Sequence, residues 1–197
     1  MFLARPAVLL LMIFFCGGEF TLAQRPGPQF WRRFSCQPLE PRTKLETFEM
    51  KYASVLLKGF TRITVPEVHD VRVDALEIRD FGNASRSTGI VVALRESGER
   101  PREERAFVDY EEIDSLISGI DALAHANETM TKLAGFEARY RTLGDLEIGV
   151  FRQTRSGAAV TLSAGICDEL TLSLTLDDLA KLRAMILEAK ARLDEIK

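Results

Sequence analysis

Two acidic segments of this sequence carry side chains that could do chemistry. They are Asp109, Glu111, Glu112 and Asp114, and then Asp177 and Asp178. Paired carboxylates can serve as general acid and base, or they can bind Ca²⁺. The alternative is helix capping, because each group stands directly before an apolar stripe of helical spacing. Neither segment has the alternating oxygen ligands, the sixth-position glycine and the twelfth-position glutamate of an EF-hand, so the pattern favours capping.

The two segments predict the same device at the start of two helices. Asp109 is expected to cap the first helix, with Glu112 reaching back to the cap residue. In the second helix Thr175 is expected to be the cap, and Asp178 the residue that reaches back. Acidic residues at these positions also suit the helix dipole.

The other residues that could support catalysis stand apart from one another. His69 and His125 are the two histidines, and neither has a partner at a metal-ligand spacing. Cys167 lies next to Asp168 and could be a nucleophile, but no histidine is near it in sequence. The chain has no GxSxG, P-loop or GxGxxG motif. We therefore predict no catalytic residue, no metal site and no cofactor.

One set of charged residues could still line a dispersed, hydrolase-type polar site. Its members are Glu137, Arg139, Arg141 and Glu147. They alternate with apolar residues on two neighbouring strand patterns, so they are expected to share one face. The alternative interpretation is an ordinary solvated sheet face.

The N-terminal residues predict export. Residues 1–23 have the pattern of a signal peptide: Arg5, an apolar run from Ala7 to Cys16, and small residues at Thr21 and Ala23. The run is too short for a comfortable membrane span, and we expect no transmembrane segment after cleavage. The expected location is periplasmic or secreted. An uncleaved anchor is the alternative.

Residues 24–43 read as an extended leader, because they hold most of the prolines and no periodicity. The leader interleaves aromatic residues with arginines from Phe30 to Phe34, a pattern that could bind an anion, a glycan or a membrane headgroup layer, or could dock its aromatic residues on the domain. After cleavage Cys36 and Cys167 would remain and could form one disulfide; two unpaired thiols are the alternative.

The apolar pattern predicts two strand-rich halves, each closed by one helix. Strands with one buried face are expected from Phe48 to Val108 and from Phe136 to Leu176. A switch in phase between Ala75 and Leu76 is what a β-bulge would cause. The apolar stripes of the two helices are Ile113, Leu116, Ile117, Ile120, Leu123 and Ala124, and Leu179, Leu182, Ile186, Ala189 and Leu193.

These elements predict an α+β fold: two antiparallel four-stranded units, each followed by an amphipathic helix, related by duplication. We expect one domain over residues 44–197, with halves of about 44–130 and 131–197. The repeated order of strands and helix, closed by the segment Leu170 to Ala189, resembles the single-stranded-DNA-binding fold of the Whirly family. That resemblance implies nucleic-acid binding through the sheet, and no binding residue is carried over. Residues from Phe107 to Ile120 and from Phe136 to Leu176 also look like uncharacterised exported bacterial proteins.

The leading hypothesis for function is an exported, non-catalytic binding or structural-interaction module, with an unknown protein or small molecule as ligand. The alternatives are the hydrolase-type enzyme and the nucleic-acid binder. The formal net charge of −3 is not the strongly basic balance that is typical of nucleic-acid binding. A homodimer through an open sheet edge or an exposed helix is a further option.

Overall fold

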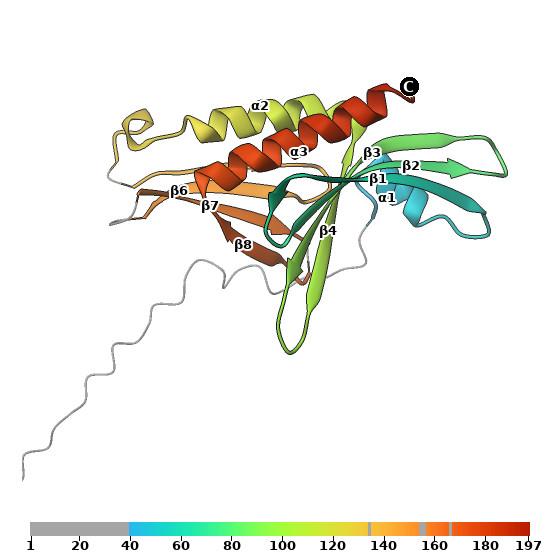
Figure 1. Cartoon of the computed structure of the whole chain (residues 1–197), viewed down its shortest axis with the longest axis horizontal. Coiled ribbons are helices and arrows are strands. Elements are labelled where there is room, and N and C mark those ends of the chain that lie inside the picture. The colour runs from blue at the N-terminus through green and yellow to red at the C-terminus, as the bar shows by residue number, and fades with distance from the viewer. Residues whose placement is uncertain (1–39, 134, 154–156, 166) are drawn as a thin grey trace, which may run out of the picture. The chain divides into compact units, whose positions relative to one another are not determined.

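Two antiparallel sheets of four strands form the framework of the protein (Figure 1). A computed structural model describes residues 40–133, 135–153, 157–165 and 167–197. Sheet A contains β1 (Leu56–Val68), β2 (Val71–Asp80), β3 (Arg86–Glu96) and β4 (Arg102–Asp109), and sheet B contains β5 (Glu137–Arg141), β6 (Glu147–Gln153), β7 (Gly157–Ala164) and β8 (Leu170–Leu174). In both sheets each strand pairs with its neighbour in sequence. The predicted arrangement of two four-stranded units, each followed by a helix, is confirmed.

The two long helices are exchanged between the sheets. α2 (Ile113–Ala124) follows sheet A but packs on β5 and β6, whereas α3 (Leu176–Asp194) follows sheet B and packs mainly on β1, β2 and β3. The helices also contact each other, and Figure 1 shows them side by side on one side of the sheets. Because each helix covers the other sheet, neither half can bury its own apolar face alone.

One hydrophobic core runs through both halves. Alternate residues of the strands enter it, such as Val73, Ile90 and Val92 from sheet A and Ile148 and Leu162 from sheet B. The predicted helix stripes also enter it, with one exception: Ala124 at the end of α2 is exposed. We call the sheet faces that enter this core the inner faces and the opposite ones the outer faces.

A short helix covers part of the outer face of sheet A. α1 (Lys44–Glu49) buries Leu45 in a second core cluster, together with Leu76, Ile78 and Val91. Thr43 begins α1 with a complete capping box, in which Glu46 reaches back. Residues from Phe48 to Glu49 are therefore helical, and the prediction of a strand from Phe48 was wrong; β1 begins at Leu56.

The predicted bulge in β2 is absent, and the reason is the second core. The register of β2 with β3 is continuous from Val71 to Arg79. Ala75 faces the main core, whereas Leu76 lies on the outer face and packs in the cluster under α1. The apolar residues of β2 therefore move from the inner to the outer face at this point, because α1 covers the outer face there. A register irregularity does occur, but in β1, between Ile63 and Val68.

The two helix starts differ, although the sequence predicted the same cap. Thr175 caps α3, and the side chain of Asp178 accepts a hydrogen bond from the Thr175 backbone, as predicted. Asp109 makes no side-chain cap at its own helix. Its carboxylate instead accepts hydrogen bonds from the backbone N–H groups of Lys44 (2.7 Å) and Leu45 (3.0 Å), at the start of α1. The predicted capping box of Asp109 and Glu112 was wrong because α1 competes for the same carboxylate.

Among the described residues no helix is long and apolar enough to cross a membrane. The predicted signal peptide, residues 1–23, and most of the predicted leader lie outside the described residues.

Candidate functional site

The half of the outer face of sheet A that no described helix covers carries a cluster of arginines from all four strands. β1 contributes one of them, β2 an arginine and an aspartate, β3 one arginine, and β4 a glutamate and an arginine. We call this set the outer arginine cluster: Arg62, Arg72, Asp74, Arg95, Glu103 and Arg105. Register brings the residues together, since Arg62 lies opposite Asp74 and Arg95 lies opposite Glu103.

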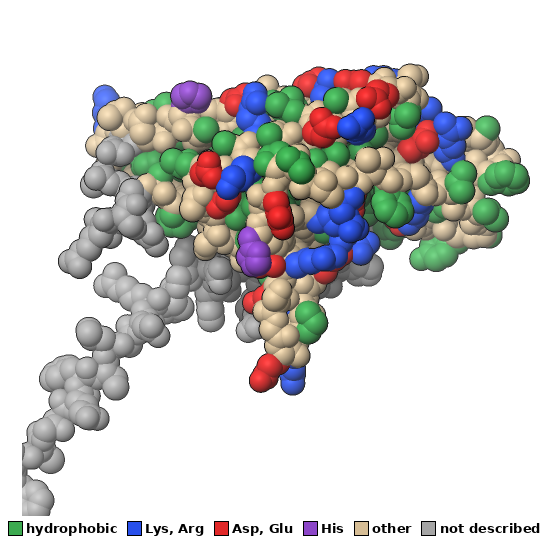
Figure 2. All heavy atoms as spheres, in the orientation of Figure 1, with side chains coloured by type: hydrophobic (Ala, Val, Ile, Leu, Met, Phe, Trp, Pro, Cys, Tyr) green, Lys and Arg blue, Asp and Glu red, His purple; other side chains and the backbone are tan. Residues whose placement is uncertain are grey.

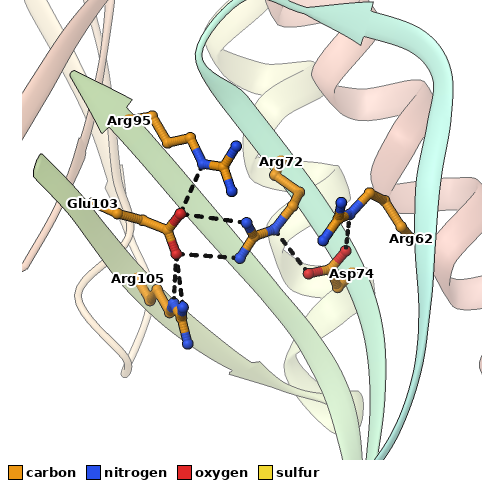
Figure 3. A network of polar contacts seen from close by, with 6 residues as sticks. All are labelled: Arg62, Arg72, Asp74, Arg95, Glu103 and Arg105. Carbon is orange, nitrogen blue, oxygen red and sulfur yellow. Dashed lines mark hydrogen bonds and ion pairs between the residues drawn. The ribbon is translucent and has the colours of Figure 1, made fainter. Parts of the chain in front are cut away.

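Glu103 is the centre of the cluster and binds three guanidinium groups (Figure 3). Arg95 donates from Nε at 2.7 Å and Arg105 donates from Nε at 2.8 Å. Arg72 approaches the same carboxylate with both terminal nitrogens, at 3.2 and 3.3 Å. Glu103 therefore orients three arginines toward one point on the sheet.

Arg72 joins this centre to a second carboxylate. Its Nε donates to Asp74 at 2.9 Å, and Arg62 donates to Asp74 from the other side at 3.3 Å. The Arg72 side chain is 15% exposed, whereas those of Arg62, Arg95 and Arg105 are 51%, 51% and 58% exposed. Arg72 thus holds the network together, and the other three present charge to solvent.

The electrostatics of the cluster are those of a preformed cationic surface. Burial acts to raise the pKa of Glu103, but hydrogen bonds from Arg95 and Arg105 and the charge of Arg72 outweigh it and lower the pKa to about 2. Glu103 is therefore ionised at neutral pH. Four arginines against two carboxylates leave an excess of two positive charges. In Figure 2 the Lys and Arg side chains gather beside the projecting β3–β4 hairpin.

An exposed aromatic residue lies on the same face. Phe60 of β1 is 67% exposed, and it lies two positions before Arg62, so both side chains point to the outer face. Its partner in β2 is Leu76, at the border of the part that α1 covers. The open half of this face thus combines cationic groups with one apolar platform.

Glu137, Arg139, Arg141 and Glu147 do share the outer face of sheet B, on β5 and β6. Arg139 lies 3.2 Å from Glu137 and 3.7 Å from Glu147. Arg141 donates to Asp145, which also accepts from Arg42 at 2.9 Å. The carboxylates are thus engaged by neighbouring arginines, and none of the four residues lines either of the grooves described below.

The carboxylates of the two acidic segments do not come together in one site. Asp109 holds the start of α1, Glu111 pairs with Lys44 at 2.6 Å, and Glu112 accepts from the backbone N–H of Leu143 at 2.9 Å. In the other segment Asp177 pairs with Lys181 at 2.7 Å. In the described part of the chain, no three His, Cys, Asp or Glu side chains are placed to hold a metal ion.

Cys167, the one cysteine among the described residues, is also separated from both histidines. Cys167 is disulfide-bonded, so its sulfur is not a free nucleophile. Cys36 lies outside the described residues, and its pairing with Cys167 stays a prediction. The aromatic and arginine segment from Phe30 to Phe34 lies outside them too. His69 is 93% exposed beside Asp70, and His125 Nδ1 lies 2.7 Å from the carbonyl oxygen of Asp121.

Two grooves border these elements. One of about 160 Å³ lies under α1 and is lined by Arg42, Met50 and Phe107, among others. The other, of about 550 Å³, lies between β1 and α3, from Thr61 to Val65 on one side and Glu188 to Glu195 on the other. Arg62 belongs to both this groove and the arginine cluster.

Sequence reasoning missed the outer arginine cluster. Its members occupy the polar positions of alternating patterns, where arginine is common on any solvated face. Only the register of four strands shows that these positions meet.

A search with the whole chain found no matching family model, no similar curated protein and no similar solved structure.

Proposed function

We propose that the protein is an exported, non-catalytic binding module that holds an anionic ligand on the outer arginine cluster. The observation that carries this proposal is the excess of positive charge on the open half of sheet A. The charge is arranged by Glu103 and Arg72 before any ligand arrives, so little ordering of side chains is required on binding.

Carboxylate groups of an acidic protein segment are the ligand that the geometry favours. Arginine is suited to them because its planar fork can bind a carboxylate with two parallel hydrogen bonds. Arg95 uses Nε for Glu103, and in Figure 3 no contact within the cluster is drawn to its terminal nitrogens. The carboxylates of Asp74 and Glu103 within the cluster would repel a continuous phosphate backbone more than separate carboxylates that fit between them.

Export is supported by the predicted signal peptide and by the disulfide at Cys167, since disulfides persist in oxidising compartments. Fractionation of cells that express the full chain tests this part. The mature protein is expected in the periplasm or medium, and a product of full length in the cytoplasm would contradict it.

Binding is tested by titrating the protein with a labelled glutamate-rich peptide. The double variant Arg95→Gln, Arg105→Gln is expected to weaken binding by about 10-fold or more, because charge-assisted hydrogen bonds are lost. The matched control is Arg79→Gln, Arg139→Gln, which removes the same charge from residues of similar exposure outside the cluster. Equal loss in both variants would mean unspecific attraction and would contradict the proposal.

Single-stranded nucleic acid is the second candidate, favoured by Phe60. Nucleic-acid-binding sheets combine cationic side chains with aromatic residues on which bases stack, and the resemblance to the Whirly family points the same way. An oligonucleotide titration distinguishes the ligands. If nucleic acid is bound, affinity falls steeply with salt and Phe60→Ala weakens it several-fold, while binding of the peptide is left unchanged.

A further inference from the structure

The first strand of sheet A has an edge that no described strand occupies. β1 pairs with β2 alone among the described strands, whereas β4 at the other edge is joined by a bridge between Phe107 and Gly144. From Leu57 to Arg62 every residue of β1 is exposed, on both faces of the sheet. Three of its large apolar side chains lie open to solvent: Leu57 at 63%, Phe60 at 67% and Val65 at 77%. A long exposed edge with apolar side chains is a site for strand addition.

There is space beside this edge. The groove of about 550 Å³ separates Thr61–Val65 from the outward side of α3, near Arg192. Leu57 and Thr61 point to the inner face and are exposed, so α3 does not cover the part of β1 from Leu57 to Thr61. An added strand can therefore approach β1 along the length between Leu57 and Val65. Beyond it, Pro66 has no N–H to donate, which ends the pairing.

We propose that the β1 edges of two copies of this chain pair in antiparallel orientation, with Thr61 of one copy opposite Thr61 of the other. The two sheets would then continue into one another through a two-fold axis normal to the sheet. This inference does not rest on the anionic ligand proposed above, because it concerns the edge of sheet A rather than its outer face.

Charge selects among the symmetric registers. Centring the pair on Lys58 or on Arg62 would place each of these cations opposite itself. Centring it on Phe60 would place Lys58 opposite Arg62 twice. Like charges directly opposite each other destabilise an antiparallel pair. These three registers are therefore disfavoured, and of the registers centred between Lys58 and Arg62 those on Gly59 and on Thr61 remain.

Apolar contact favours the register on Thr61. There Phe60 faces the guanidinium of Arg62 of the second copy, where a cation–π contact can form, and Leu57 comes next to the irregular segment of β1 that carries Val65. Both exposed aliphatic side chains thereby gain an apolar partner across the interface. With the register on Gly59, Val65 would lie beyond the paired strands. Of the two remaining registers, only the one centred on Thr61 therefore brings Leu57, Phe60 and Val65 all into the interface.

The two-fold axis has a consequence for the arginine cluster. An axis normal to the sheet keeps the outer faces of both copies on the same side. The two clusters then lie on one continuous face, so a ligand with several anionic groups could contact both and gain avidity. The dimer and the anionic ligand can be tested separately. If the protein is a monomer and the Arg95→Gln, Arg105→Gln variant still binds the peptide more weakly than wild type, the dimer is excluded and the proposed function stands.

Sedimentation equilibrium of the full chain tests the dimer. Wild-type protein is expected to associate to a dimer, and Thr61→Lys is expected to raise the dissociation constant by about 10-fold or more, since two lysines then face each other. Ser173→Lys is the matched control, an exposed position on β8, and should leave association unchanged. A monomer at millimolar protein, or a dimer that Thr61→Lys does not weaken, would overturn the proposal.

Cysteine cross-linking tests the register. Under mild oxidation Thr61→Cys is expected to give a covalent dimer, because residues opposite each other have Cβ atoms about 5 Å apart. Gly59→Cys is the control: a Cβ there meets no atom within 4 Å, so it folds normally, but it lies opposite Ile63 of the second copy. Cross-linking of Gly59→Cys in place of Thr61→Cys would overturn this register.

Discussion

The outer face of sheet A and the outer face of sheet B differ in what covers them. On sheet A, α1 buries Leu45 against Leu76 and Val91, and the outer arginine cluster occupies the remaining half. On sheet B the corresponding face carries an ion-pair group around Glu147 and a row of small hydroxyl residues that includes Ser163. An antiparallel sheet needs only one buried face. Among the described residues the cover on sheet A is therefore an addition to the repeated unit, and it packs on the strands that present the arginines.

The same contrast appears where the helices begin. The second unit uses the local cap of Thr175 and Asp178, within four residues of chain. In the first unit Asp109 serves α1, which lies far away in sequence, and Glu112 accepts from Leu143 at the entrance to the second sheet. The carboxylates of the first unit thus connect separate elements, while those of the second complete one helix. The two units thus share the acidic pattern at the helix start but not the hydrogen-bond partners of its carboxylates.

Two glycines at outer-face positions give the largest test of this contrast. In Gly89→Ala the new Cβ would lie 2.2 Å from the carbonyl oxygen of Val108 and 2.7 Å from Leu45, both held in place by packing. We expect the free energy of unfolding to fall by about 3 kcal/mol. In Gly149→Ala the nearest atom is the Thr161 hydroxyl, at 2.7 Å, which can rotate away. A change below about 1 kcal/mol is expected there. Urea denaturation measures both, and equal losses would remove the distinction between the two faces.

The second largest loss of stability is expected at the two aspartates of the helix starts. Asp109→Ala would leave the backbone N–H group of Leu45 without its acceptor in a buried place and that of Lys44 without its acceptor in a part-buried one, so a loss of about 2 kcal/mol is expected. Asp178→Ala removes one side of a local cap, and about 1 kcal/mol or less is expected. The variants are compared by thermal unfolding followed by circular dichroism. An Asp178→Ala loss larger than that of Asp109→Ala would contradict the assignment of Asp109 to α1.

Sequence reasoning predicted what depends on neighbours along the chain. The alternation of strand residues, the stripes of both helices and the capping box of Thr175 all reappear in the structure. Each of these signals is complete within one segment, so no knowledge of the rest of the fold is needed.

It failed where two distant segments compete for the same residue. Phe48 looked like the start of a strand because nothing local shows that α1 packs on Ile78. The step from Ala75 to Leu76 imitated a bulge for the same reason. The arginine cluster was not predicted because its members lie on four strands, and their meeting depends on the register of three strand pairs.

The pH dependence of stability should distinguish the arginine cluster from the rest of sheet A. The pKa of Glu103 is about 2 in the folded protein, below the ordinary value for a glutamate. Its contribution is therefore fully present above about pH 4.5 and is lost as the pH falls toward 2. Wild type and Glu103→Gln are expected to differ by on the order of 1 kcal/mol at neutral pH, because solvent screens the arginines. Urea titrations should show this difference shrinking to nothing in acid; a difference that is constant with pH would show that Glu103 acts by shape alone.

The smallest effect is expected on the hydroxyl row of sheet B. Ser163 lies 2.8 Å from the Thr171 hydroxyl across β7 and β8. In Ser163→Ala the exposed Thr171 can turn its hydroxyl to water, so the free energy of unfolding should fall by only about 0.5 kcal/mol. Ser163 itself is only 7% exposed, so a loss of more than about 1.5 kcal/mol in the urea titration would mean that the Thr171 hydroxyl is shielded from water as well. The outer face of sheet B would then be covered as that of sheet A is, and the cover would belong to the repeated unit itself.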